Sequence, residues 1–426
     1  MSDSRTVDDP ATRPAATGAS PDLPLAQAAE VGIDPRPLDR LCEWIRDQNL
    51  DIRSFLIVKD GRLVFEFYGD GLERASNHET YSITNTVTSL LFGILADEGR
   101  ISPTDKLADW LARDHPDLTP ALQDKQAIEL GHLLSMSSGL FYTLTGPADP
   151  LANPPNRLQI ALTAAAKAAP ATVFNYTIVS PMLVGAAITA ASGVPIDQFA
   201  EERLLKPLQM ENYGWTGADQ TGVVSGGSGL RLRAMDIAKL GVMMLHGGRW
   251  QGEQIVPQAW IREMSTPKAT ARDYGYFCWI NHVVETEPAF GAMGFRGQFM
   301  TILPKRNAVI VMTSLLPETG GVKDAAFLQL YRRMVNDYVL PALQGATAAS
   351  FTGSAQQALR QEPERGAEPA GQSHPPVAHP PVAHPPVAHP PVAHPPVAHP
   401  PVAHPPLAHP PSAHAPAAQH TGRHAP

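Results

Sequence analysis

The sequence is poor in cysteine and in charge. Only two cysteines, Cys42 and Cys278, occur among 426 residues. They allow at most one disulfide, so burial of apolar side chains must hold the fold together, and a reducing compartment fits this usage. Charged residues make up 17% of the chain, the net charge is -8, and no run of clustered Lys and Arg occurs. Because phosphate contacts need such clusters, we expect no nucleic-acid partner.

Long apolar segments are also lacking. No stretch of about 18 apolar residues occurs, so the sequence predicts no membrane-spanning helix. Residues 1–24 combine Pro, Asp, Ser and Ala without the apolar run that a secretory signal requires. This composition predicts a disordered leader. We therefore expect a cytoplasmic protein with no membrane partner and a substrate from the cytosol.

Proline and histidine are abundant, but they gather at the C-terminus. Of 43 prolines and 16 histidines, 18 and 11 lie in residues 374–426, where His-Pro-Pro-Val-Ala repeats with a period of five and Leu407 interrupts the repeat once. In polyproline II, successive histidines would lie roughly 15 Å apart, too far for neighbours to share one metal ion. Residues 346–426 are therefore predicted to be a disordered tail acting as a solvated spacer, with metal scavenging or docking to a proline-binding partner as alternatives.

The remaining chain, residues 25–345, is the predicted domain. It begins with a helix and a hairpin. Apolar residues at helical spacing predict a helix ending at Arg46, and the stretches 54–58 and 63–68 predict a β-hairpin around a Lys-Asp-Gly-Arg turn. A further helix is predicted up to about Glu98, closed by Gly99. It opens a region, residues 83–270, in which helical patterns predominate.

Strand patterns return near the end of this domain. We predict strands at 275–284, 299–303 and 308–314, and a last helix at 325–343. One sheet would thus form from residues 50–82 and 271–345, flanked by the N- and C-terminal helices. With the helix-rich region inserted between its strands, the fold class is α+β with an antiparallel sheet.

A candidate nucleophile lies where the hairpin region leads into this helix. In Tyr81-Ser82-Ile83-Thr84-Asn85, Ser82 occupies the predicted helix N-terminus. Unpaired backbone N–H groups and the positive end of the helix dipole favour a hydroxyl that develops negative charge there. A serine at this place is also the common N-cap residue, so this segment alone leaves both roles open.

Several further segments, taken together, resemble those of the serine β-lactamase and penicillin-binding protein superfamily, especially its class C-like esterases and 6-aminohexanoate-dimer hydrolases. They follow the family's order and spacing over nearly the whole predicted domain. The segments are His132–Leu140 (HLLSMSSGL), Phe174–Tyr176 (FNY), Gly229–Gly241 with Gly248–Trp250 (GLRLRAMDIAKLG and GRW), Tyr274–Trp279 (YGYFCW) and Gly294–Gln298 (GFRGQ).

The resemblance implies a β-lactamase-like fold and acyl transfer through Ser82, the first residue of the family's Ser-x-x-Lys motif. It implies that Tyr176 acts as general base and acid. An oxyanion hole would combine the N–H of Ser82 with one from the strand following Gly297 and Gln298. Arg296 would lie near a substrate carboxylate or carbonyl, or else form a surface salt bridge, and Gly297 with Gln298 would form the edge of the substrate pocket.

The sequence departs from the family pattern at the base. Position 85 carries asparagine where the motif has lysine, and a neutral amide cannot accept the serine proton. We therefore assign Asn85 a positioning role. Ile178 likewise replaces the asparagine that many members carry two residues after the tyrosine. The one literal Ser-x-x-Lys, Ser265 to Lys268, contains Pro267, which disfavours a helix, so we regard it as a decoy.

Three functions remain open from the sequence. The first is a serine esterase, amidase or acyltransferase that acts on a small ester, amide or lactone and uses Tyr176 as base. The second is a catalytically impaired module that binds an acyl or peptide-like ligand, and the third is a different reaction at Ser82 and Asn85. His78 is an alternative base or a solvated loop residue. No cluster of metal ligands occurs in the domain, so we expect neither metal nor cofactor, and the oligomeric state stays open.

Overall fold

The computed structural model describes residues 22–143, 150–151, 154–317 and 326–345. The predicted tail, residues 346–426, and most of the predicted leader lie outside this range. The end of the leader is a correction, because Leu23 is buried in the core. The carbonyl of Pro24 accepts a hydrogen bond from Leu63, and Asp22 pairs with Arg233. Residues 22–24 therefore belong to the ordered domain.

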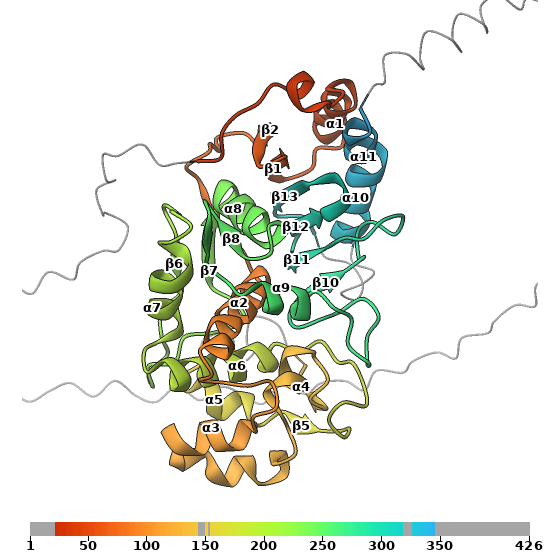
Figure 1. The fold of residues 1–426 in the computed structure, drawn as a ribbon. Coiled ribbons are helices and arrows are strands. Elements are labelled where there is room, and N and C mark those ends of the chain that lie inside the picture. The colour runs from red at the N-terminus through yellow and green to blue at the C-terminus, as the bar shows by residue number, and fades with distance from the viewer. Residues whose placement is uncertain (1–21, 144–149, 152–153, 318–325, 346–426) are drawn as a thin grey trace, which may run out of the picture. The chain divides into compact units, whose positions relative to one another are not determined.

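A six-stranded antiparallel sheet is built from both ends of the domain, in the order β10-β11-β12-β13-β1-β2 (Figure 1). The N-terminal hairpin pairs with the last strand, so that Phe55 lies opposite Met312 and Ile57 opposite Ile310. This arrangement confirms the predicted α+β class with its hairpin. The strands are β1 (Ile52–Lys59), β2 (Arg62–Tyr68), β10 (Trp279–Ile280), β11 (Phe290–Gly294), β12 (Gln298–Leu303) and β13 (Ala308–Ser314).

One predicted strand is wrong in extent. Of residues 275–284, only Trp279 and Ile280 form a strand, β10. Phe277 and Asn281 adopt positive φ angles of 50° and 51°, which interrupt the extended backbone on both sides. The sheet instead gains β11, which the strand patterns did not predict.

Helices cover both faces of the sheet. Tyr331 of α10 (Ala326–Met334) stacks on Phe299 of β12 with ring centroids 4.0 Å apart. The next residue, Met300, points to the opposite face, because side chains alternate along a strand. There it meets Gly241 of α8 (Ala234–Leu245). The face of α10 also carries α1 (Arg36–Asp47), η5 (Val335–Val339) and α11 (Leu340–Leu343).

The inserted region is mainly helical and also contains short strands. Its helices are α2 (Ile83–Asp97), α3 (Leu107–Asp114), η2 (Pro116–Lys125), α4 (Leu130–Leu134), α5 (Arg157–Ala161), α6 (Val179–Ser192), α7 (Ile196–Ala200), η3 (Glu201–Leu205), α8 and α9 (Gln258–Met264). Its strands are β4 (Leu140–Phe141), β5 (Ala165–Ala166), β6 (Gly214–Trp215), β7 (Leu230–Arg233), β8 (Arg249–Trp250) and β9 (Glu253–Gln254), and β7 also pairs with β3 (Asn77–Glu79). Two short 3-10 helices, η1 (Ala28–Val31) and η4 (Pro304–Arg306), lie outside the region.

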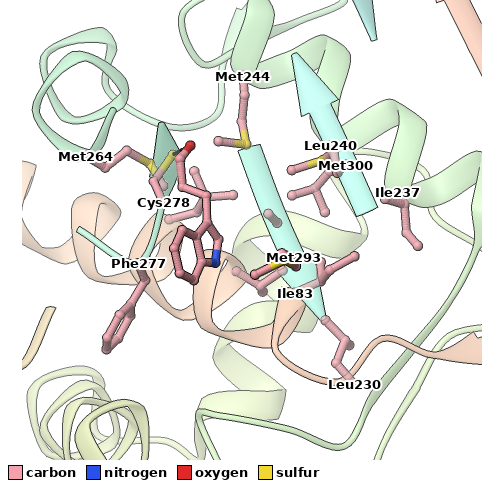
Figure 2. Close-up of a cluster of buried hydrophobic side chains, with 14 of the residues drawn as sticks. Ile83, Leu230, Ile237, Leu240, Met244, Met264, Phe277, Cys278, Met293 and Met300 are labelled. Atoms are coloured by element: carbon pink, nitrogen blue, oxygen red, sulfur yellow. Dashed lines mark hydrogen bonds between the residues drawn. The ribbon is translucent and has the colours of Figure 1, made fainter. Parts of the chain in front are cut away.

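Helix α2 runs between the sheet and the inserted helices, and its residues from Ile83 to Leu95 are all buried (Figure 1). Ile83 reaches a methionine-rich cluster with Met293 and Met300, which also contains Cys278 (Figure 2). Burial raises the pKa of the Cys278 thiol to about 12, and both cysteines are free. The first residue of α2 is thus anchored in the core, which holds the residue before it, Ser82, in place.

None of the described helices is, by itself, long and apolar enough to cross a membrane. The bent pair formed by 179–192 and 196–205 reaches that length and composition only when its two helices are taken together.

Candidate active site

Ser82 lies directly before α2, at the turn that leaves β3. The turn is fixed because the backbone N–H and the hydroxyl of Thr80 both donate to the carbonyl of Leu230. Tyr81 adopts a φ of 47°, a left-handed conformation that is uncommon for a bulky residue. The side chain of Ser82 makes no capping hydrogen bond to α2. The N-cap role therefore does not hold for Ser82, and its hydroxyl is left for the adjoining cavity.

This cavity has a volume of about 620 Å³ and joins segments that are far apart in the sequence. Ser82 and Tyr176 both line this one space. Its lining residues are Tyr81, Ser82, Asn85, Tyr142, Thr143, Asn175, Tyr176, Thr177, Ile178, Pro181, Gly227, Ser228, Met293, Gly294, Phe295 and Phe327.

The amide of Asn85 connects α2 to the tyrosine. Asn85 follows Ser82 by one helical turn, is 3% exposed, and donates from Nδ2 to the phenolic oxygen of Tyr176 at 2.9 Å. Burial raises the pKa of Tyr176 above its ordinary value, while hydrogen bonds with Ser82 and Asn85 act in the opposite direction. The phenol therefore keeps its proton at neutral pH. The structure brings Ser82, Asn85 and Tyr176 together.

Aromatic side chains hold the ring of Tyr176. Trp279 stacks on it with ring centroids 5.7 Å apart, and Tyr274 contacts it edge-on at 6.1 Å. Tyr274 and Trp279 also contact each other at 4.8 Å, and Phe174 packs against Tyr274. This packing restricts the ring to one orientation. The support that Trp279 gives to Tyr176 follows from the tertiary packing, because the two residues are far apart in the sequence.

Arg296, Gly297 and Gln298 are absent from the described lining of the cavity. The guanidinium of Arg296 donates to the carbonyls of Leu315 and Leu316. Gln298 is 1% exposed and donates to the carbonyl of Ser314 at 2.6 Å.

Gly297 is also closely packed against Ser314, because a Cβ at Gly297 would lie 2.2 Å from the hydroxyl oxygen of Ser314. The neighbouring Met293, Gly294 and Phe295 line the cavity instead. The hairpin between β11 and β12 turns the arginine back towards the end of β13. The part of this hairpin that borders the cavity is therefore residues 293–295, three positions before the predicted residues 296–298.

The remaining candidates lie elsewhere. His78 is buried in β3, outside the described lining of the cavity, and burial lowers its pKa to about 4. The hydroxyl of Ser265 donates to the carbonyl of Ile261 at 2.7 Å. Lys268 lies over the ring of Tyr276, 3.8 Å from its centroid. Neither residue lines the cavity, in agreement with the decoy interpretation. Among the described residues, no group of three or more His, Cys, Asp or Glu side chains could hold a metal ion.

The antiparallel sheet, the inserted helices and the serine at the start of a buried helix are those of the β-lactamase-like serine hydrolases. The sequence signature of the Beta-lactamase family matches residues 53–333, and the chain belongs to this family. The resemblance seen in the sequence is confirmed.

Individual relatives are distant. The 6-aminohexanoate-dimer hydrolase of Paenarthrobacter ureafaciens is 21% identical over 292 residues, which cover 62% of this chain and 73% of the relative. EstCE1, described as a hydrolase with promiscuous acyltransferase activity, superposes with a TM-score of 0.57 at 17% identity, covering 71% of this chain and 98% of its own. A penicillin-binding protein homologue from Caulobacter crescentus gives 0.58 at 16% identity, with coverages of 72% and 97%. At these identities the superpositions show the fold alone.

Proposed function

We propose that the protein transfers acyl groups from a small ester, amide or lactone through an acyl-enzyme at Ser82. The observation that supports this most directly is that Ser82 and Tyr176 open into one cavity, with Asn85 Nδ2 2.9 Å from the phenolic oxygen. A serine needs a proton acceptor within hydrogen-bond reach. Tyr176 is the titratable side chain in contact with Ser82 that can fill this role once it is ionised.

In the proposed reaction, the ionised oxygen of Tyr176 accepts the proton of Ser82 while Oγ attacks the carbonyl carbon. The tetrahedral oxyanion accepts hydrogen bonds from the backbone N–H of Ser82 and from that of Phe295, which replaces the donor expected after Gln298 because Phe295 lines the cavity. Tyr176 then protonates the leaving alcohol or amine as the acyl-enzyme forms. A water or second alcohol gives its proton to Tyr176 and attacks the acyl carbon, and Ser82 recovers its proton. No cofactor is needed.

Asn85 supplies a hydrogen-bond donor to Tyr176 but no positive charge. Because burial raises the pKa of Tyr176, only a small fraction of the tyrosine is ionised at neutral pH. Turnover is therefore slow, since the loss of a general base costs about 10² to 10⁴ in rate. The same two features favour a second candidate, a module that binds an acyl ligand without turning it over.

Intact-mass analysis after treatment with a fluorophosphonate separates these functions. We expect one adduct on the wild type and on Ser265→Ala, which is the matched control for a serine in a Ser-x-x-Lys sequence. Ser82→Ala should stay unlabelled. An adduct on Ser82→Ala overturns the proposed nucleophile. Labelling of Asn85→Lys alone, with an unlabelled wild type, identifies the non-catalytic binding module.

A further inference from the structure

Charge is missing from the described wall of the cavity. Its lining contains no Asp, Glu, Lys, Arg or His among the described residues. One part is apolar or aromatic: Tyr81, Tyr142, Ile178, Pro181, Met293, Phe295 and Phe327. The remaining side chains of the lining are polar but uncharged: Ser82, Asn85, Thr143, Asn175, Tyr176, Thr177 and Ser228. A substrate in this part of the cavity meets hydroxyls, amides and apolar surface.

The described cations next to these lining residues in the sequence, Arg296 and Arg231, are bound elsewhere. Arg296, next to Phe295, donates to two backbone carbonyls at the end of β13. Asn85 stands where the family motif carries an ammonium group, so its position adds no charge. Arg231, three residues after Ser228, donates to the side-chain oxygen of Asn77. Within the described residues, therefore, no cation is placed to pair with a substrate carboxylate in the cavity.

A carboxylate that enters such a site loses water without gaining an ionic partner, and this desolvation is unfavourable. Neutral chains do not carry this penalty, and apolar surface buried against Ile178, Met293 and Phe295 stabilises their binding. A volume of about 620 Å³ lies within the range of cavities that hold ligands of drug-like size. The cavity has room for more than an acetyl group.

We propose that the site takes uncharged acyl substrates of medium chain length and discriminates against those that carry a carboxylate. As a statement about turnover this rests on the proposed function, whereas as a statement about binding it stands alone. The relevant chemical class is a neutral ester or amide with an aliphatic or aromatic acyl chain. Phe295, 43% exposed at the cavity, is one of the residues that set this preference.

The first test compares p-nitrophenyl hexanoate with mono-p-nitrophenyl adipate, which has the same chain length and ends in a carboxylate. Rates measured with Ser82→Ala are subtracted. We expect kcat/KM to be at least about ten-fold higher for hexanoate, equivalent to about 1.4 kcal/mol. Phe295→Lys should lower this ratio at least about ten-fold, whereas the uncharged control Phe295→Gln should leave it near the wild-type value. Equal rates, or faster turnover of adipate, overturn the proposed specificity.

The second test needs no turnover. Binding of hexanoyl p-nitroanilide and adipoyl mono-p-nitroanilide to Ser82→Ala is followed through tryptophan fluorescence, since Trp279 stacks on Tyr176. We expect Kd to be at least about ten-fold lower for the neutral anilide. Equal affinity, tighter binding of the anion, or no saturable binding of the neutral compound overturns the inference. Absence of turnover dependent on Ser82, with selective binding retained, instead rejects the proposed function alone.

Discussion

The side-chain nitrogen of Asn85 lies 2.9 Å from the phenolic oxygen of Tyr176. An amide in this position donates a hydrogen bond to the tyrosine as a lysine would. It neither accepts a proton nor places a positive charge beside the phenol. Asn85 therefore gives Tyr176 a hydrogen bond without the nearby positive charge that would favour its ionisation at neutral pH.

Asn85→Lys should increase activity. A lysine near Tyr176 would favour the phenolate while charged and could accept a proton in its neutral amine form, so we expect kcat/KM for a short-chain ester at pH 7 to rise about 10²- to 10⁴-fold. Asn85→Met is the control, because it has a long side chain without charge. Steady-state ester hydrolysis measures both variants. A lysine variant that folds but is no faster than the methionine variant would contradict the proposed role of Tyr176.

The wild-type rate should increase with pH. Since the pKa of Tyr176 lies above its ordinary value, the fraction of phenolate grows about ten-fold per pH unit at all pH values below that pKa. The logarithm of kcat/KM, corrected with Ser82→Ala, should therefore rise with a slope near one between pH 7 and 9.5. In Asn85→Lys the plateau should move to lower pH. A flat or falling wild-type profile would show that the reacting form is not an ionised tyrosine.

Trp279→Leu should impair the chemical step more than substrate binding. The indole stacks on Tyr176 and fixes its ring. Without it, the phenolic oxygen samples orientations away from Ser82, so we expect kcat to fall about ten-fold with little change in KM. Trp279→Phe should retain most of the activity. Trp250→Leu, a buried tryptophan outside the described cavity lining, controls for lost stability. Equal losses of kcat in both leucine variants would assign Trp279 a purely structural role.

Gly241→Ala should destabilise the fold. A Cβ at Gly241 of α8 would lie 2.5 Å from a methyl group of Val309 on β13. The helix cannot move away from the sheet without opening the core, so we expect the free energy of unfolding to fall by about 1–3 kcal/mol. Denaturant unfolding measures this. The double variant with Val309→Ala should be less destabilised than the sum of the two single variants, and simple additivity would argue against this contact.

Elements whose signals are local were predictable. The helix from Ile83 begins where apolar spacing begins and ends where Gly99 adopts a φ of 68°. The hairpin was equally clear from its two apolar stretches around a glycine turn. The predicted strand at 275–284 was too long because its apolar composition cannot show the positive φ angles of Phe277 and Asn281.

The sequence by itself determined the class of fold and the position of Ser82 at a helix start, since periodicity and turn chemistry depend on neighbouring residues. It suggested Tyr176 only through resemblance, because that tyrosine lies 91 positions from Asn85. Only the tertiary structure decided that Met293, Gly294 and Phe295 face the cavity while Arg296 and Gln298 bind the end of β13. Which side of a hairpin borders a cavity depends on the pairing of distant strands and the packing of helices on them.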